Sequence, residues 1–260
     1  MLIRDIVTPI EEFAPLSLQE SYDNAGLIVG RLDDELRGGV LLAVDVTEAV
    51  VEEAIEKGCG LIITHHPIIF HPLKRLNSAS VVERCVEMAI RNNIALYACH
   101  TNLDSAPNGM SWRVGEMLGL SDMEVLQPTV DGAGFGVVGV LREGVSEELF
   151  LQRVKEVFGV KTLRHSALLG REVKRVAICT GAGASLMPEA KASGCDIYLT
   201  ADLKYNDFYT PDSHFVVVDM GHFESEFCAI AILFDVLSKI FINFALYKSA
   251  QSQNPVYYFV

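Results

Sequence analysis

Several protein classes are excluded by what this 260-residue chain lacks. Its six cysteines form no CxxC pair, so neither a zinc ribbon nor a secreted disulfide framework is indicated. They lie mostly in apolar runs, which favours buried, reduced thiols that act as small hydrophobic groups. The first residues, MLIRDIVTPIEEFAPLS, contain no uninterrupted apolar core of the signal-peptide type. We therefore expect a reducing, cytoplasmic environment.

Basic residues are also scarce. The chain has 21 Lys and Arg against 34 Asp and Glu, a formal net charge of -13. A field of this sign repels phosphate backbones, so binding to nucleic acid is disfavoured. A nucleotide is not excluded, because a bound cation can reverse the sign of the local field.

One apolar segment, from Phe227 to Tyr247, is nearly long enough to cross a bilayer. Within it, Asp235, Lys239 and Asn243 recur every four residues and Ser238 joins them in one narrow polar stripe. This pattern predicts a helix buried on most of its circumference, in the core or against another subunit, and argues against a membrane helix.

The first half of the chain alternates strand and helix signals. Strands are predicted at 39–45, 60–64 and 94–98, with helices at 47–57 and 80–92 between them. This βαβαβ order predicts parallel strands joined by right-handed crossovers.

A composition shift follows at 127-QPTVDGAGFG-136, where turn-forming residues predict a domain boundary. The elements expected beyond it are strands at 135–141, 173–180, 196–200 and 215–221 and helices at 146–159 and 185–193.

Two adjacent histidines, His65 and His66, end the apolar run 60–64, and Pro67 then stops the strand. Imidazole is the commonest metal ligand, and ligands usually bind at the carboxyl ends of strands in an α/β sheet. Because neighbouring strand residues point to opposite faces, the pair can serve two metal ions. The alternative is a turn followed by a buried polar pair.

Two further segments carry ligand-type residues. In 222-HFESE-226, the i,i+4 spacing places His222 and Glu226 on one helical face, where they form either a ligand pair or a capping pair. In 100-HTNLD-104, Asp104 can bind a metal or begin an Asx-turn. His100 can be a ligand, an acid–base group or a buried donor behind a ligand.

A glycine pair in 180-TGAGAS-185 follows a strand and opens a helix, as a phosphate-binding turn would. The full GxGxxG pattern fails because Leu186 stands at its last position. A tight strand–helix turn is therefore predicted, with weak binding of a nucleotide phosphate as the alternative.

The ligand-type residues are more informative together than singly. Five residues offer nitrogen or oxygen ligands: His65, His66, Asp104, His222 and Glu226. A single catalytic zinc ion usually has three protein ligands and one water molecule. Five ligands suit two metal ions that share a bridging carboxylate, roughly 3.5–4 Å apart. Mixed imidazole and carboxylate ligation is compatible with Zn, Fe, Mn, Co or Ni.

Four motifs closely resemble the dinuclear metal-centre family, also labelled Nif-three-like or GTP cyclohydrolase 1 type 2 homologue. They are 23-DNAGLIVG-30, 64-THHPIIF-70, 100-HTNLD-104 and 221-GHFESE-226, and the resemblance runs from Asp23 to the C-terminal helix. It implies the same five metal ligands as the spacing. Two residues depart from the family pattern: Asn206 stands where many relatives have histidine, and Tyr22 where they often have tryptophan.

The resemblance also implies a fold of two α/β domains of the Nif-three-like type, with the C-terminal strand and helix returning to the first. The metal-binding domain would then comprise 1–126 and 215–260, and the second domain 127–214. A ring-shaped homohexamer with metal sites facing an internal cavity is implied as well.

These features predict a cytoplasmic dinuclear metallohydrolase, in which metal-bound water attacks an electrophilic carbon or phosphorus. The family label suggests opening of the imidazole ring of GTP, and His100 is the expected acid–base residue. The alternative is a non-catalytic, metal-binding regulatory or scaffold protein whose metal pair stabilises the hexamer.

Overall fold

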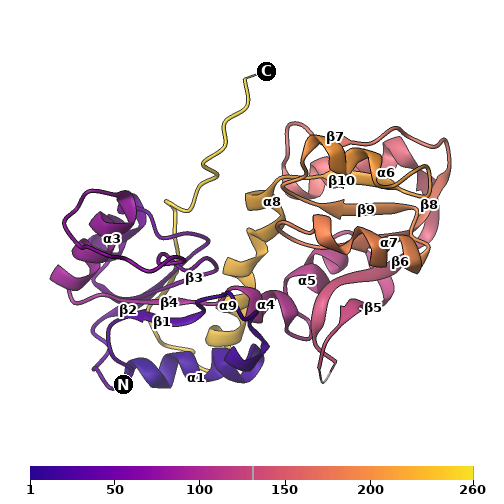
Figure 1. Cartoon of the computed structure of the whole chain (residues 1–260). Coiled ribbons are helices and arrows are strands. Elements are labelled where there is room, and N and C mark those ends of the chain that lie inside the picture. Colours follow the sequence, from indigo (N-terminus) through magenta and orange to yellow (C-terminus); the bar gives the residue numbers. More distant parts are fainter. Residues whose placement is uncertain (131, 260) are drawn as a thin grey trace. The chain divides into compact units, whose positions relative to one another are not determined.

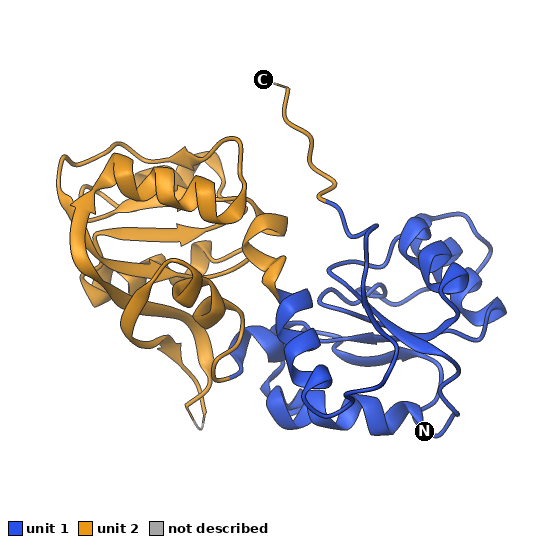
Figure 2. Ribbon diagram, turned by 180° about the vertical axis from the view of Figure 1, so that it is seen from behind, with its two compact units in different colours: residues 1–106, 229–253 blue, residues 107–228, 254–260 orange. Residues whose placement is uncertain are grey.

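Two β-sheets, each with its own helices, organise the chain (Figure 1). The structure is a computed structural model, and it describes residues 1–130 and 132–259. Unit 1 comprises Met1–Ala106 and Ala229–Gln253, and unit 2 comprises Pro107–Cys228 with the C-terminal residues from Asn254 onward (Figure 2).

The sheet of unit 1 has five strands in the order β1-β4-β3-β2-β11. They are β1 (Gly26–Val29), β2 (Gly39–Ala43), β3 (Cys59–Thr64), β4 (Ala95–Ala98) and β11 (Leu246–Lys248). Only β1 is antiparallel to its neighbour, so β3 and β4 leave the sheet at the same edge. Every residue of β3 is buried, as expected for a parallel strand covered on both faces.

Helices cover both faces of this sheet, and Figure 1 shows α3 on one side and α1 on the other. The helices of unit 1 are α1 (Ile3–Phe13), α2 (Glu48–Glu56), α3 (Val81–Arg91), α4 (Thr101–Ser105) and α9 (Cys228–Ser238), with a 3₁₀ turn at Leu16–Leu18. Thr47 and Ser80 cap α2 and α3, since their hydroxyl oxygens accept from the backbone amides of Val50 and Glu83. A core of aliphatic residues forms between these two helices and the strands: Leu41, Ile62, Leu96, Val50, Val51 and Ala89.

The sheet of unit 2 has six strands in the order β5-β6-β8-β9-β10-β7, and β8, β9 and β10 are parallel. The strands are β5 (Leu120–Pro128), β6 (Gly134–Ser146), β7 (Arg164–His165), β8 (Glu172–Ile178), β9 (Ile197–Thr200) and β10 (Val216–Asp219). The helices are α5 (Met110–Met117), α6 (Glu147–Phe158), α7 (Met187–Ser193) and α8 (His222–Glu226), with 3₁₀ turns at Ala184–Leu186 and Tyr205–Tyr209. Its core packs α7 against the sheet through Met187, Ala190, Tyr198 and Val217.

The predicted fold class is confirmed, but the boundaries between the units differ from those predicted. Residues 120–128 form β5, which pairs with β6, so the turn-rich stretch 127–136 is a hairpin inside unit 2. Asp131, in this stretch, lies outside the described residues. Residues 216–219 form β10, which pairs with β9 in the same sheet. The boundaries therefore fall at 106/107 and 228/229 instead of 126/127 and 214/215, because turn-forming residues serve a hairpin as well as a linker.

The apolar segment 227–247 was predicted to form a single helix, but it forms a helix followed by a strand. Helix α9 ends at Ser238, and β11 follows eight residues later in the sheet of unit 1. Lys239 and Asn243 thus lie beyond the helix and do not share a helical stripe with Asp235. It is α9 and β11 that return to the first unit, and not the strand predicted at 215–221. Among the described helices, none has the length and apolar character needed to span a membrane.

A buried carboxylate holds the segment after β11 against unit 1. Glu53 on α2 is 6% exposed and accepts hydrogen bonds from Ser249 Oγ (2.5 Å) and from the amides of Ala250 and Gln251 (3.1 and 3.3 Å). Burial raises the pKa of Glu53, but these hydrogen bonds outweigh burial and the pKa is lowered overall.

Glu53→Gln is expected to lower the free energy of unfolding by about 1–3 kcal/mol, because the amide cannot accept the same three bonds. The pKa of Glu53 is lower in the folded protein than in the unfolded chain, so ionised Glu53 stabilises the fold at a pH above the unfolded pKa. This stabilisation is lost as the pH falls through the pKa of Glu53 in the folded protein. Urea unfolding of both proteins should therefore differ most at neutral pH and converge in acid. A difference that does not change with pH would contradict this assignment.

Candidate metal centre

His65, His66 and His100 meet at the edge where β3 and β4 leave the sheet of unit 1. His65 and His66 directly follow β3, and their amides both donate to the carbonyl of Val44 (3.1 and 3.0 Å). The amide of Cys99 donates to the carbonyl of Thr64 (2.8 Å), which keeps the exit of β4 beside that of β3. The parallel pairing of these strands thus brings His100 close to two histidines that lie far from it in sequence.

Each of these histidines is anchored through Nδ1 to an oxygen of unit 1. The bonds run from His65 to the Cys99 carbonyl (2.7 Å), from His66 to Asp45 Oδ1 (2.8 Å) and from His100 to Asp23 Oδ1 (2.6 Å). A carbonyl or an ionised carboxylate can only accept, so Nδ1 carries the proton and Nε2 of the neutral ring carries the lone pair. Histidines that bind metals in proteins are typically oriented in this way.

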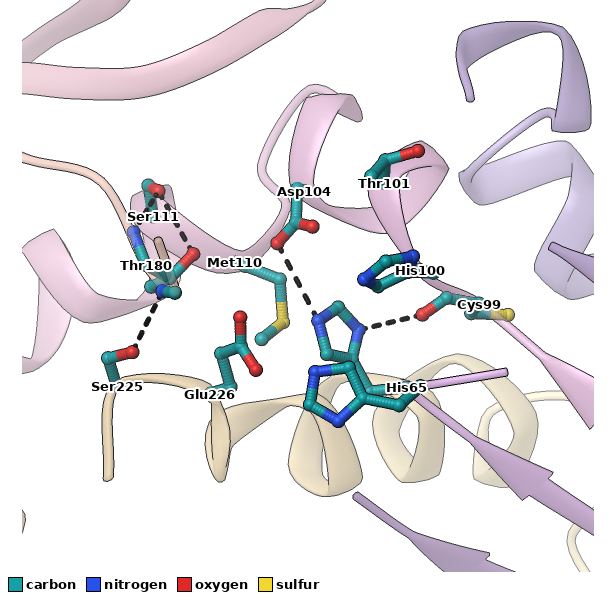
Figure 3. Close-up of polar contacts among 12 residues, drawn as sticks. His65, Cys99, His100, Thr101, Asp104, Met110, Ser111, Thr180, Ser225 and Glu226 are labelled. Atoms are coloured by element: carbon teal, nitrogen blue, oxygen red, sulfur yellow. Dashed lines mark hydrogen bonds and ion pairs between the residues drawn. The ribbon is translucent and has the colours of Figure 1, made fainter. Parts of the chain in front are cut away.

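The three imidazoles form a compact group, here called the histidine cluster (His65, His66 and His100). Their ring centroids are 4.9–5.4 Å apart, and one ligand atom from each lies within 4.8 Å of the others. Figure 3 shows His100 turned toward His65, and the bond from His65 to the Cys99 carbonyl. His65 is fully buried and the other two are half-buried. This group can bind a metal ion.

Asp104 and Asp23 extend the cluster. Asp104 lies on α4, and its Oδ1 is 3.8 Å from His65 Nε2 (Figure 3). The side chain of Asp23 is fully buried, and besides His100 it accepts from the Thr101 amide (3.0 Å) and hydroxyl and the Asn24 amide (2.7 Å). Burial raises the pKa of Asp23, but the bonds from His100 and Thr101 prevail and lower it to about 2. One carboxylate therefore positions both His100 and the start of the helix that carries Asp104.

In unit 2, His222 lies between two carboxylates. Its Nε2 is 2.9 Å from Glu226 Oε2, one helical turn away, and its Nδ1 is 2.8 Å from Asp202 Oδ2. Burial lowers the pKa of His222, but Glu226 and Asp202 raise it to about 9, so the imidazole holds a second proton at neutral pH. The chemistry of this donor set suits a cation, since a divalent ion at Nε2 would replace that proton between the same groups.

A glycine makes room for Glu226. A Cβ atom on Gly181 would lie 2.2 Å from Glu226 Oε1, and the residue has φ of +63°, which favours glycine. The amide of Gly181 donates to Ser225 Oγ (2.9 Å), next to Glu226. The turn after β8 therefore shapes the space occupied by the carboxylate.

Amides of the same turn bond to side chains of unit 2. The amide of Thr180 donates to Ser111 Oγ (3.2 Å) (Figure 3). The amide of Gly183 donates to Thr200 Oγ1 (2.9 Å), so both amides are used within the chain. The tight strand–helix turn predicted at 180–185 is confirmed, and the alternative of nucleotide-phosphate binding gains no support.

The predicted site residues thus fall into two groups, one in each unit. Unit 1 holds His65, His66, His100 and Asp104, and unit 2 holds His222 and Glu226. The anchoring carboxylates were missed. Asp45 follows β2 but does not cap α2, which Thr47 caps; its carboxylate accepts from His66 Nδ1 instead. Asp23 and Asp202 had no predicted role, although Asp23 opens the first of the four motifs that carry the resemblance.

Fold and donor groups together define an α/β protein with buried histidine and carboxylate groups that can bind a metal ion. The chain belongs to the Duf34/NIF3 (NGG1p interacting factor 3) family, whose model matches residues 1–255.

Curated relatives and solved structures agree with this assignment. A Clostridium acetobutylicum protein named "GTP cyclohydrolase 1 type 2 homolog" is 33% identical to this chain, and the match covers 97% of both chains. A Lactococcus lactis protein of the same name is 35% identical to this chain, with 99% of both chains covered. A Bacillus cereus protein related to NIF3 has the same fold, with a TM-score of 0.93, 24% identity and coverage of 100% of this chain and 99% of that one. A Staphylococcus aureus hypothetical protein superposes with a TM-score of 0.91 and 27% identity over 100% and 99% of the two chains.

Proposed function

We propose that the chain is a hydrolase that depends on two divalent metal ions bound by His65, His66, Asp104, His222 and Glu226. The observation that carries this proposal is the anchoring of His65, His66 and His222 through Nδ1. Anchored rings present Nε2 in a fixed direction, which lowers the cost of binding a metal. When bound, such ions lower the pKa of a coordinated water so that hydroxide is available at neutral pH.

The side chains of the proposed site have separate tasks in this reaction. Asp45 and Asp202 orient His66 and His222 and increase their basicity, because each carboxylate accepts from Nδ1. The sequence predicts an acid–base role for His100. Its bond to Asp23 suits both this role and metal ligation, because either one uses the lone pair of Nε2.

An aromatic group beside the histidine cluster favours a planar substrate. Phe70 is 41% exposed, and its ring centroid lies 6.0 Å from that of His100 and 6.4 Å from that of Tyr22, which is 64% exposed. Exposed aromatic rings stack on nucleobases. Lys74 and Arg75 follow in the same exposed loop and add positive charge in an acidic chain. The aromatic rings and the basic loop suit a nucleotide, and the curated relatives are named for GTP, so GTP is the first substrate to test.

The test measures metal content and hydrolysis on the same preparations. The full-length protein is loaded with Zn²⁺, Mn²⁺, Co²⁺, Fe²⁺ or Ni²⁺, and GTP, other nucleotides and phosphodiesters are offered. We expect two equivalents of metal per chain and turnover of at least one substrate. His66→Ala and Glu226→Ala should each lower turnover more than about 100-fold, since loss of groups behind a ligand already costs 10–100-fold.

His214→Ala is the matched control, because His214 is exposed and lies outside both the proposed ligand set and the aromatic group. Light scattering follows the homo-oligomer, which we propose to be a hexamer. No more than one metal equivalent would contradict the dinuclear site. Absence of turnover in the wild type, with loss of assembly in the ligand variants, would instead establish a metal-stabilised scaffold.

A further inference from the structure

Asp219 ends β10 and contacts the two backbone segments that carry Asp202 and His222. Its Oδ1 accepts from the amide of Gly221 (3.1 Å), and its Oδ2 accepts from the amide of Leu203 (3.0 Å). Leu203 follows Asp202 in sequence, and Gly221 precedes His222. We propose that Asp219 is a positioning residue that holds Asp202 against Nδ1 of His222. The proposal rests on the proposed function, because Asp219 acts through a proposed metal ligand.

The side chain of Asp202 is 54% exposed, so packing alone does not fix its position. Its backbone has φ of +55°, a left-handed conformation that residues other than glycine rarely adopt. Such a conformation persists where the surrounding structure determines it. On one side, the amide of Ala201 donates to the Gly181 carbonyl (2.9 Å). On the other side, the amide of Leu203 donates to Asp219, which thus helps to fix the backbone at Asp202.

The start of α8 is fixed by the same carboxylate. Gly221 is the residue before α8, and its φ of +91° turns the chain from β10 into the helix, which Figure 1 shows beside the end of that strand. The bond from its amide to Asp219 holds this turn. His222 begins α8 and Glu226 ends it, so the turn determines where both side chains start. One carboxylate therefore positions both partners of the 2.8 Å bond between His222 Nδ1 and Asp202 Oδ2.

Arg164 supplies the positive charge that the buried carboxylate of Asp219 requires. Asp219 is 7% exposed, and Arg164 lies opposite to it in the neighbouring strand β7. Nη2 of Arg164 donates both to Asp219 and to the carbonyl of Leu203 (3.0 Å). The guanidinium also lies over the ring of Phe208, 5.5 Å from its centroid. Because a buried carboxylate is stable when it is paired and hydrogen-bonded, this pair is a firm anchor for the loop at Leu203.

A purely structural role for Asp219 would have a different consequence from a positioning role. A structural ion pair stabilises unit 2 as a whole, and its loss has no selective effect on His222. A positioning residue acts through Asp202, so its removal should matter little once the carboxylate of Asp202 is gone. A double-mutant cycle separates the two roles, because substitutions that act through one group are not additive.

The experiment measures the Co²⁺ affinity of the full-length protein by competition with a chelator. Asp219→Asn keeps the size of the side chain, but its Nδ2 cannot accept a hydrogen bond. We expect Asp219→Asn and Asp202→Ala each to weaken Co²⁺ binding at least about 10-fold. Adding Asp219→Asn to Asp202→Ala should weaken binding by less than about twofold more. Effects that multiply, or an unchanged affinity in Asp219→Asn, would show that the proposal is wrong.

Glu147→Gln is the matched control. Glu147 lies in unit 2, is 3% exposed and accepts from the backbone amides of Leu169 and Gly170, so its loss should also lower stability. The Co²⁺ affinity of Glu147→Gln should equal that of the wild type. An equal loss of affinity in Glu147→Gln and Asp219→Asn would mean that destabilisation of unit 2 is the cause, and the proposal would be overturned.

Arg164→Met is the second variant, in case Asp219→Asn fails to fold, and circular dichroism checks both. It removes the counter-ion of Asp219, so it should weaken Co²⁺ binding in the wild type but hardly at all in Asp202→Ala. An effect of the same size in both proteins would contradict the proposal.

Turnover and metal content of the wild type test the proposed function separately. A non-additive cycle without turnover of any substrate would contradict the hydrolase and support the positioning role of Asp219. Turnover in the wild type, with unchanged Co²⁺ affinity in Asp219→Asn, would contradict only the positioning role. A wild type that binds no Co²⁺ would contradict both.

Discussion

Replacing Gly181 by alanine is expected to remove metal binding at the His222–Glu226 pair. The new Cβ atom would lie 2.2 Å from Glu226 Oε1, closer than any two such atoms approach, so the carboxylate must leave its position. Because Glu226 side-chain atoms are almost fully buried, the chain has little room to move it elsewhere. We expect the variant to lose at least one metal equivalent per chain, measured by elemental analysis of the loaded protein.

A matched control separates this effect from backbone strain. Gly194 ends α7 with φ of +68°, close to the +63° of Gly181, but a Cβ atom there would meet no atom within 4 Å. Both alanine variants should lose about 1–2 kcal/mol of stability from the left-handed conformation. Only Gly181→Ala should lose metal. Equal metal content in the two variants would show that Gly181 does not shape the space around Glu226.

Asp23→Ala is expected to have the largest effect on the stability of unit 1. The buried carboxylate accepts from His100 Nδ1, from the amide and hydroxyl of Thr101 and from the amide of Asn24. Alanine would leave the donors of Thr101 and His100 without their acceptor in a largely buried place, at a cost on the order of 3 kcal/mol or more. Chemical unfolding measures this loss. Metal affinity at the histidine cluster should fall as well, because His100 and the start of α4 lose their common anchor.

Asp23→Asn provides the comparison for that prediction. Asparagine keeps the size of the side chain and one acceptor oxygen, so it can still accept from His100 and Asn24. Its amide group cannot accept from Thr101, so an intermediate loss of stability is expected. A loss as small as that of an exposed substitution such as Asp33→Ala would mean that Asp23 is not an anchor.

The position of the main site residues can be predicted from apolar runs that indicate strands and from the shared edge at which parallel strands end. The strands at 60–64 and 94–98 are apolar and short, and parallel neighbours leave a sheet at the same edge, so this rule places the residues that follow them near one another. The structure confirms both strands and their parallel pairing. The i,i+4 contact of His222 with Glu226 is equally local and is also present.

The anchors of the histidines could not be predicted in this way. Asp23 is 77 residues from His100, Asp45 is 21 from His66 and Asp202 is 20 from His222, and no periodicity links such pairs. Strand β5 was missed for a different reason. Its buried and exposed residues do not alternate regularly, so its sequence does not have the period of two that indicates a strand.

His65 and His66 are neighbours in sequence, but their Nδ1 atoms donate to different kinds of acceptor. His66 donates to the carboxylate of Asp45, whereas His65 donates to the neutral carbonyl of Cys99. A negative partner shifts electron density onto the ring and makes it the stronger donor to a cation. An ion on His65 would therefore keep more of its positive charge and be the stronger Lewis acid. Adjacent in sequence and identical in type, the two imidazoles are electronically unequal.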